Sequence, residues 1–277
     1  MKPKPPFFLA LPAVLTLSIL FNLPMLWIFC KTFSQDGFKF YIKFMTDPFY
    51  LGILWNTVKV SLQVTFISLL LGYPTAYFLS RTKSKIRNIL MIMVIFPFLV
   101  SAVVRSYGWM VILGKRGLLN QFLQGFGLIQ DTLTILNTPA AVIIGLAHLL
   151  VPYMILSICG VLQGLDRNVE YAAYSLGAGT VKTFFKVVLP LSSPGIISGC
   201  ILVFNLSMTS YVTPKLLGGA RFRTMSTMVF QELNVNFNQG FAAAISYILL
   251  FVILVILVIS NYTTANIMNR VGAAKDA

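Results

Sequence analysis

The sequence predicts an all-α membrane protein with six transmembrane helices in one bundle. Hydrophobic residues make up 57% of its 277 residues and charged residues only 10%, whereas a soluble domain averages about 25% charged residues. The mean hydropathy is +0.84. Six apolar stretches are long enough to cross a bilayer, which takes about 20 residues each. We therefore expect a single transmembrane domain over residues 1–277, without a separate soluble domain.

The first three spans are expected at roughly 7–29, 56–80 and 88–113. The first is too long for a cleaved signal peptide and lacks a small-residue cleavage site before Lys31, so we expect it to be retained. The third contains Pro97, followed by a charged side chain at Arg105.

The last three spans are expected at roughly 139–164, 191–214 and 241–266. The segment 215–240 is polar and is expected to be an outer loop with a short interfacial helix. Small residues spaced four apart allow two helices to approach closely. The sequence contains two such patterns, Gly160-x3-Gly164 and Gly195-x3-Gly199.

Basic residues predict the topology. The net charge of +14 would suggest nucleic-acid binding in a soluble protein, but in a membrane protein it more often reflects the enrichment of Lys and Arg in cytoplasmic loops. The short segment 81–87, RTKSKIR, is the densest basic stretch. It predicts that both termini and the 165–190 loop lie in the cytoplasm.

The 165–190 loop interrupts the apolar sequence with polar residues and glycines, and it contains two short helical patterns. In the first, an apolar stripe recurs at helical spacing and Gly177 can end the helix. Asn168 is the expected N-cap of that helix, and Pro190 is expected to end the second. Two small helices outside the bilayer, joined on both sides to spans, are typical of a docking element. The first stripe consists of Val169, Ala172, Ala173 and Leu176, and the second of Val181, Phe184, Phe185 and Val188.

This loop resembles a known motif. Ala172-Ala173-x-x-x-Gly177, then nine residues, then Val187-x-Leu189-Pro190 is similar to the EAA loop in inner-membrane permeases of bacterial ATP-binding-cassette (ABC) importers. The resemblance implies that the loop docks into a groove on an ATPase subunit. The family's usual Glu position is held here by Tyr171, and Glu170 lies one residue earlier. The implied ATPase-coupling residues are Val169, Glu170, Tyr171, Ala172, Ala173, Leu176, Gly177, Leu189 and Pro190.

Further segments resemble the spermidine/putrescine branch of these permeases: GYPTAYFLSR at 72–81, the stretch 95–114, GLLN at 117–120 and YVTPKLLGG at 211–219. The resemblance covers about residues 50–265. It implies a six-helix, type I-like importer fold in the bacterial inner membrane. The implied partners are a second homologous permease, two cytoplasmic ATPase subunits, a periplasmic solute-binding protein and membrane lipid, without nucleic acid.

No cofactor site is expected on this chain. Gly108-x5-Gly114-Lys115-Arg116 is one residue too long for a phosphate-binding loop and lacks the Ser or Thr that would hold magnesium. ATP and magnesium would therefore bind the partner ATPase. The sequence has one histidine, His148, and no acidic residue in any predicted span. These are too few titratable groups to form a catalytic or metal site. Helix packing is the commoner role of such a histidine.

Polar residues within the spans are candidates for the substrate pathway, because burying them in lipid is costly. Arg105 lies beside Tyr107 and Trp109 in the third span. Its alternatives are an outer-end position reaching the interface or an ion pair with another subunit. Asn205, Thr209 and Tyr211 lie in the fifth span, where contacts between helices are the alternative to lining the pathway.

The sequence leaves two other functions open: an ion-coupled secondary transporter acting without an ATPase, and a membrane protein with a structural role. The absence of acidic residues from the spans argues against the first. For a permease, the resemblance suggests a polyamine or a related amino-acid-like or opine-like solute. We also expect Gly177→Asp to leave membrane insertion intact but to uncouple transport.

Overall fold

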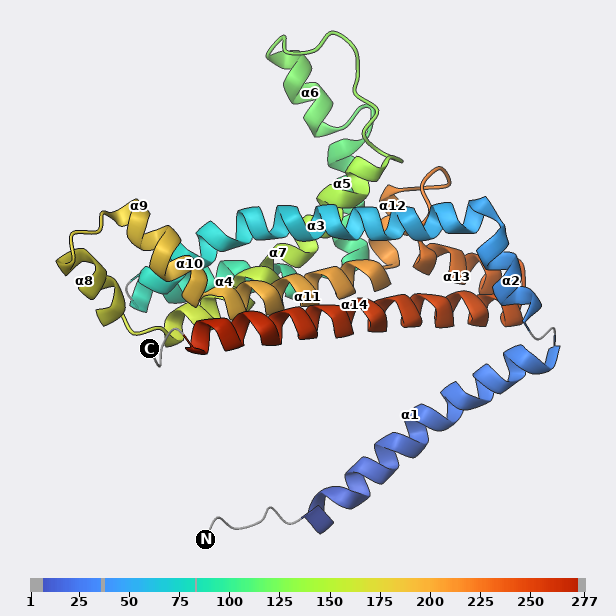
Figure 1. Ribbon diagram of the computed structural model, residues 1–277. Helices are drawn as coiled ribbons and strands as arrows, with labels where there is room; N and C mark the ends of the chain where they lie inside the picture. Colours follow the sequence, from blue (N-terminus) through green and yellow to red (C-terminus); the bar gives the residue numbers. More distant parts are fainter. Residues whose placement is uncertain (1–6, 36–37, 83, 274–277) are drawn as a thin grey trace. The chain divides into compact units, whose positions relative to one another are not determined.

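The computed structural model describes residues 7–35, 38–82 and 84–273, and all of its regular elements in that part of the chain are helices (Figure 1). Four helices are long and apolar enough to cross a membrane, and there are up to six spans if each of two bent helix pairs counts as one. The predicted all-α membrane fold is therefore confirmed. The terminal residues 1–6 and 274–277, which were assigned to the cytoplasm, lie outside the described residues.

The elements follow one another along the chain, and the longest connection is residues 126–138, between α6 and α7. Their bounds are α1 (Phe7–Gln35), α2 (Lys39–Thr46), α3 (Pro48–Arg81), α4 (Ser84–Leu99), α5 (Ala102–Leu113), α6 (Leu118–Gly125), α7 (Pro139–Gly164), α8 (Asn168–Ser175), α9 (Thr180–Thr183), the π-helix η1 (Phe184–Val188), α10 (Leu189–Leu191), α11 (Ser193–Thr209), α12 (Val212–Leu217), α13 (Met225–Asn234) and α14 (Gln239–Ala273).

The chain forms two compact units. Unit 1 contains the chain up to Gly52 together with Met228–Leu250, and unit 2 contains Ile53–Thr227 together with the segment from Phe251 onward. The long helices α3 and α14 contribute to both. Each unit is described by itself.

Unit 1 is organised around aromatic rings from α2, α3 and α14. Phe44 stacks on Tyr50 with ring centroids 5.8 Å apart, and Tyr50 meets Phe241 edge-on at 5.0 Å. The Lys43 ammonium lies 4.8 Å from the centroid of the Phe241 ring, a cation–π contact that holds a charged residue against an apolar cluster. These aromatic residues therefore pack α2 against α3 and α14 within unit 1.

Unit 2 is built on α7, whose bounds match the predicted fourth span. Helix α7 packs along α11. A Cβ added at Gly195 of α11 would lie 3.0 Å from Val161 Cβ, and a Cβ added at Gly199 would lie 2.7 Å from Met154 Sδ. This glycine pair thus allows close helix approach, as predicted. The same expectation is wrong for Gly160 and Gly164, because a Cβ there would meet no described atom within 4 Å.

One predicted span is broken, and another begins at a bend. The third consists of α4 and α5, and the segments Lys85–Leu99 and Ala102–Gly125 meet at 95°. The fifth begins where Thr180–Leu191, the second helical segment of the loop, meets Ser193–Thr209 at 61°. The second helical segment of the loop, Thr180–Leu191, ends one residue after Pro190. The fifth span also ends earlier than predicted, at Thr209, and α12 follows.

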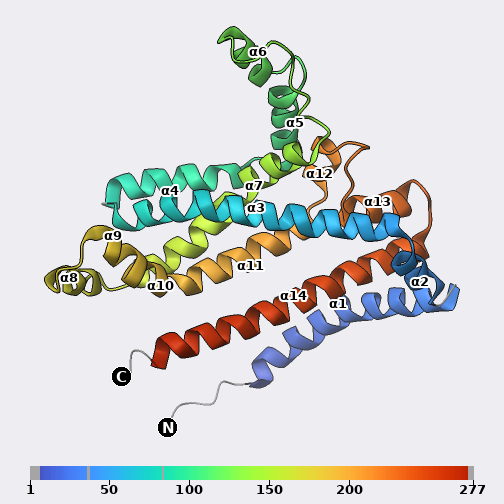
Figure 2. The ribbon, with the colours of Figure 1, turned by 45° about the horizontal axis from the view of Figure 1, so that its top comes forward.

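The connectors outside these helices are also structured. Figures 1 and 2 show α6 standing away from α3, α7 and α11, and α8 with α9 beyond one end of these helices. Asn120 in α6 is only 2% exposed. Its amide donates to the carbonyls of Gly114 and Leu133, both at 3.0 Å, and its oxygen accepts from Leu133 N at 2.8 Å. The short helix predicted within 215–240 is present as α13.

Candidate functional site

The first helix of the 165–190 loop is α8, and its two ends are set by different residues. At the start, the predicted cap Asn168 is wrong: its own backbone N–H donates to Asp166 Oδ1 at 2.9 Å, so Asp166 provides the capping oxygen. At the end, Gly177 has φ +80°. Gly177 N donates to Tyr174 O and Ala178 N to Ala173 O, which is a Schellman motif. Glycine adopts this left-handed conformation without steric cost.

The predicted apolar stripe of α8 remains exposed. None of the eight residues of α8, all of them described, is buried. Leu176, the C-cap residue, is 88% exposed, and Val169 and Ala172 are also exposed. Tyr171, at the position where the resemblance places a Glu, is 59% exposed. Exposed apolar residues on a polar connector indicate a contact surface for another protein.

The second apolar pattern does not keep one face. Val181 and Phe185 are exposed, whereas Val188 is buried and Phe184 half-buried. The two exposed residues are four apart, as are the two less exposed ones, so the pattern divides into two adjacent rows on the helix surface. The π-helical turn η1 forms the second part of this segment. Leu189 and Pro190 follow in α10, half-buried and exposed respectively.

Glu170 does not lie on the exposed stripe of α8. Its carboxylate forms an ion pair with Arg81, the last residue of α3. Arg167, just before α8, donates from Nη2 to the carbonyl of Ser80 at 3.3 Å. Since one residue is a turn of about 100° on a helix, the shift of the acidic residue from 171 to 170 directs it toward α3.

The three candidate residues of α5 differ in their surroundings, and Trp109 contacts α7. Trp109 Nε1 donates to Nδ1 of His148 at 3.3 Å. Arg105 Nη1 donates to the carbonyl of Pro97 at 2.6 Å, across the bend between α4 and α5. Tyr107 is exposed. Arg105 therefore has a structural contact within its own span, which the sequence alternatives did not include, and His148 joins two helices as expected.

Asn205 and Thr209 are the candidate residues of α11. The Thr209 hydroxyl donates to the backbone carbonyl of Asn205 at 3.0 Å. Asn205 Oδ1 is buried and has no hydrogen-bond partner among the described residues. Tyr211 lies beyond the end of α11, at the N-cap of α12. Asn205 borders a cavity of about 530 Å³ between α3, α11 and α14, lined by Val58, Leu62, Thr65, Ile196, Ile197, Cys200, Ile201, Phe204, Asn205, Ile256 and Ser260.

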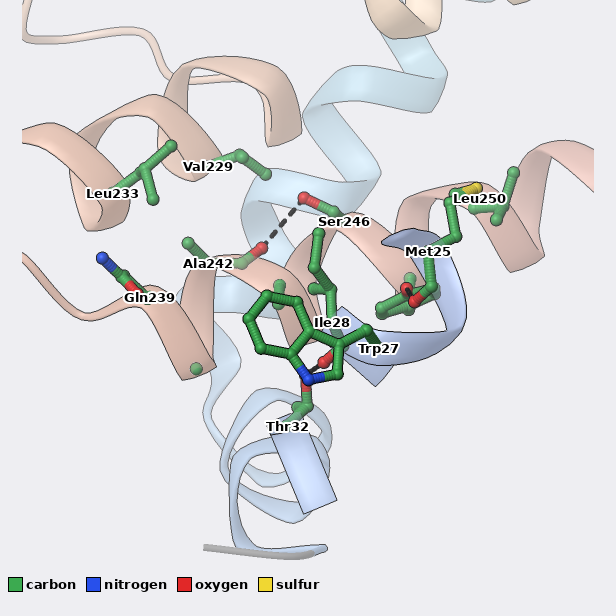
Figure 3. A pocket seen from close by; sticks show the side chains of 13 residues that line it. Met25, Trp27, Ile28, Thr32, Val229, Leu233, Gln239, Ala242, Ser246 and Leu250 are labelled. Atoms are coloured by element: carbon green, nitrogen blue, oxygen red, sulfur yellow. Dashed lines mark hydrogen bonds between the residues drawn. The ribbon is translucent and has the colours of Figure 1, made fainter. Parts of the chain in front are cut away.

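A further cavity of about 440 Å³ lies in unit 1 between α1, α13 and α14 (Figure 3). Its lining is almost entirely apolar, and its hydroxyl groups are used within the chain. Tyr247 OH donates to Met25 O at 2.6 Å, and Ser246 Oγ to Ala242 O at 2.9 Å. No charged residue is among those that line it. This cavity therefore has no residue of opposite charge to pair with a charged solute.

Within the described residues, no three His, Cys, Asp or Glu side chains come together as metal ligands. The candidate sites in the described part of the chain are therefore an exposed loop, polar and aromatic residues in the spans, and apolar cavities.

Comparison with known proteins identifies the family. Residues 68–267 match the family described as the binding-protein-dependent transport system inner membrane component. The chain belongs to this family. The match includes α4, α5, the whole 165–190 loop and α11, and therefore the candidate residues of these elements.

Individual relatives agree with the family. The spermidine/putrescine transport system permease protein PotB of Haemophilus influenzae is 36% identical over 95% of this chain and 91% of its own length. PotB of Escherichia coli is 34% identical over 82% of each chain. The inner membrane ABC transporter permease protein YdcU of Escherichia coli is 31% identical over 84% of this chain and 75% of its own.

Solved structures show the same fold. A chain of a bacterial alginate ABC transporter, in complex with an alginate pentasaccharide-bound periplasmic protein, matches with a TM-score of 0.76 at 17% identity over 94% of both chains. A chain of the MetNI methionine ABC transporter, in an inward-facing conformation, matches with a TM-score of 0.60 at 16% identity over 80% of this chain and 99% of its own. The predicted ABC importer permease fold is confirmed.

The chain is thus a multi-pass permease subunit of a binding-protein-dependent ABC importer in the bacterial inner membrane. In this class ATP hydrolysis resides in the partner ATPase, as predicted. The alternatives of a secondary transporter and of a purely structural protein are set aside.

The residues that sequence reasoning missed are the partners of the loop on α3. Tyr73, Tyr77 and Arg81 are spaced at i, i+4 and i+8, on one face of the last turns of α3. This regular spacing of two aromatic residues and one basic residue indicates a shared face on α3, but it does not identify the residues that pack on that face. Arg81 entered the predictions only through the basic segment 81–87 and the resembling segment 72–81.

Proposed function

We propose that this permease imports polyamines such as spermidine and putrescine, or a related amino-acid-like or opine-like solute. It would form the pathway with a second, homologous permease and receive the solute from a periplasmic binding protein. Two cytoplasmic ATPase subunits would drive it by alternating access. The names of the PotB relatives and the extent of their match support the solute class.

The 165–190 loop would couple the permease to the ATPase, with both chain termini on the same cytoplasmic side. The observation that supports this role is the exposed apolar surface of α8 and its C-cap, formed by Val169, Ala172 and Leu176. A short helix that lays apolar residues into a groove is a recurring mode of recognition. Gly177 matters here because its left-handed turn fixes where the helix ends. Tyr171, Ala173, Leu189 and Pro190 would border the contact.

Replacing Leu176 by Asp tests this role directly. The charge would enter the docking groove without disturbing the fold, because Leu176 is 88% exposed. We expect the ATPase that co-purifies with the permease to fall by roughly tenfold, the effect of about 1.4 kcal/mol of binding free energy. Leu118→Asp is the matched control, since Leu118 is also exposed but lies in α6. Equal ATPase recovery for both variants would contradict the proposal.

The solute would pass the aromatic and polar residues of α5 and α11. Trp109, Tyr107 and Tyr211 offer aromatic faces, which attract ammonium groups by about 0.5–2 kcal/mol each. Asn205 adds an amide oxygen without a partner among the described residues. With no acidic residue in the spans, these groups are our candidates for contacting a polyamine, and Arg105 and Thr209 would line the same route.

Uptake by the complete transporter in proteoliposomes tests the solute class. Radiolabelled spermidine should enter in an ATP-dependent manner, and an amino acid or an opine should compete poorly. Trp109→Ala should lower spermidine uptake more than Trp109→Phe, because only the latter keeps an aromatic face. Trp55→Ala is the control for losing an exposed tryptophan from α3. Uptake of the amino acid alone would overturn the polyamine assignment.

A further inference from the structure

The last turns of α3 form a seat for the segment that contains α8, η1 and α10. Tyr73 OH and Ser192 Oγ lie 3.0 Å apart in a buried hydrogen bond. The Phe184 ring meets the rings of Tyr73 and Tyr77 edge-on, with centroids 5.7 Å and 5.4 Å away. This edge-to-face geometry is favourable for aromatic pairs. The π-helical part of the segment is thereby fixed to α3 by packing.

The α8 part of the segment is held in a different way. None of its eight described residues is buried, and an isolated helix shorter than about 12 residues is marginally stable. Its main tie to the bundle is the ion pair between Glu170 and Arg81, supported by the bond from Arg167 to the carbonyl of Ser80. The orientation of α8 therefore depends on charged side chains more than on a core.

The ion pair is shielded better than an ordinary surface pair. The side chains of Arg81 and Glu170 are 20% and 15% exposed. The Arg81 guanidinium also lies 5.4 Å from the centroid of the Tyr77 ring, so the aromatic seat and the ion pair share one side chain. Partial burial reduces solvent screening, and removing either partner leaves the other charge without its counterion.

We propose that Arg81 and Glu170 form an intramolecular latch that sets the orientation of α8 against α3, so that movement of the docked loop is passed to the transmembrane bundle. The proposal rests on the coupling role proposed for the loop, and it makes both residues positioning residues. Glu170 then acts within its own chain and not on the ATPase. The exposed stripe provides the docking contact, and the latch transmits the displacement.

Charge exchange tests the latch in the complete transporter with its ATPase and binding protein. Arg81→Gln and Glu170→Gln should each leave ATPase co-purification within about twofold. Each should lower the stimulation of ATP hydrolysis by loaded binding protein roughly tenfold, a typical coupling between sites. The double variant Arg81→Glu with Glu170→Arg should restore most of the stimulation. Arg81→Lys, which keeps the charge, should retain more than Arg81→Gln.

The two readouts separate this proposal from the coupling role itself. Loss of ATPase binding in Leu176→Asp tests docking, whereas stimulation at unchanged binding tests the latch. If Glu170→Gln loses the ATPase while Arg81→Gln does not, Glu170 contacts the ATPase directly and the latch is wrong. If both single variants keep the normal stimulation of ATP hydrolysis, the latch is also wrong. If the double variant does not accumulate in the membrane, the test is whether Arg81→Lys retains more of this stimulation than Arg81→Gln.

Discussion

The two helix bends of unit 2, between α4 and α5 and between α10 and α11, satisfy their polar groups differently. At the bend between α4 and α5, the polar contacts stay within one segment: Ser101 Oγ accepts from Val103 N at 3.3 Å, and Arg105 reaches back to the carbonyl of Pro97. At the bend between α10 and α11, Ser192 is fully buried. Its hydroxyl donates to Leu189 O at 3.0 Å and also bonds Tyr73 of another helix.

The two bends differ in which parts of the fold supply their hydrogen-bond partners. A helix break in a membrane leaves backbone groups that must find partners inside the protein. The α4–α5 bend finds them within eight residues of sequence, so it can form as soon as that segment does. The α10–α11 bend takes one partner from α3, 119 residues away. It is therefore coupled to the helix that also seats the 165–190 loop.

The largest effect is expected from Gly195→Leu, immediately after the second bend. A Cβ at Gly195 lies 3.0 Å from Val161 Cβ and 3.1 Å from Ile158 Cα, and the backbone of α7 cannot yield easily. We expect a loss of about 3 kcal/mol in the free energy of unfolding, measured by SDS titration in micelles. Gly160→Leu should be nearly neutral, because no described atom lies within 4 Å of its added Cβ. Equal losses would refute the packing difference.

Arg105→Met should lower the free energy of unfolding by about 2 kcal/mol. This is the value of a hydrogen bond from a charged donor whose acceptor is left unpaired. The carbonyl of Pro97 would lose the donor that spans the first bend. The same SDS titration measures it, and Arg105→Lys should recover part of the loss. If Arg105→Met unfolds like the unmodified protein but transports poorly, the side chain serves the pathway and not the bend.

Ser192→Ala should lower the free energy of unfolding by about 1.5 kcal/mol, since it leaves the buried Tyr73 hydroxyl without its partner. Tyr73→Phe should cost less, because Ser192 still donates to Leu189 O. A double-mutant cycle of the two substitutions measures the coupling between them. An additive cycle would show that the second bend is as local as the first.

Ser101→Ala should have the smallest effect, about 0.5 kcal/mol, at the low end for loss of an N-cap. Ser101 is exposed, so solvent or a lipid headgroup can replace its hydroxyl. Ser101→Asn should be neutral, because Asn is also a good cap. A loss as large as that of Ser192→Ala would mean that exposure does not distinguish the two bends.

Sequence reasoning succeeded where the signal was local. The fourth span was placed at the bounds of α7, since its apolar run starts at a proline suited to the first helical turn and ends at Gly164. Gly177 was expected to end the first helix of the loop, and its backbone does adopt the left-handed turn. The continuous third span was wrong, because hydropathy averages over a bend whose cost is offset by single side chains such as Arg105.

By itself, the sequence determined the membrane class, the helical spans and the position of the exposed loop, because composition and helical periodicity act over a few turns of chain. Only the tertiary structure decided that Glu170 meets Arg81, 89 residues earlier, that Tyr73 completes the second bend, and which glycines face a helix. These contacts join segments that are distant along the chain. They depend on how whole helices pack, which no local pattern of residues specifies.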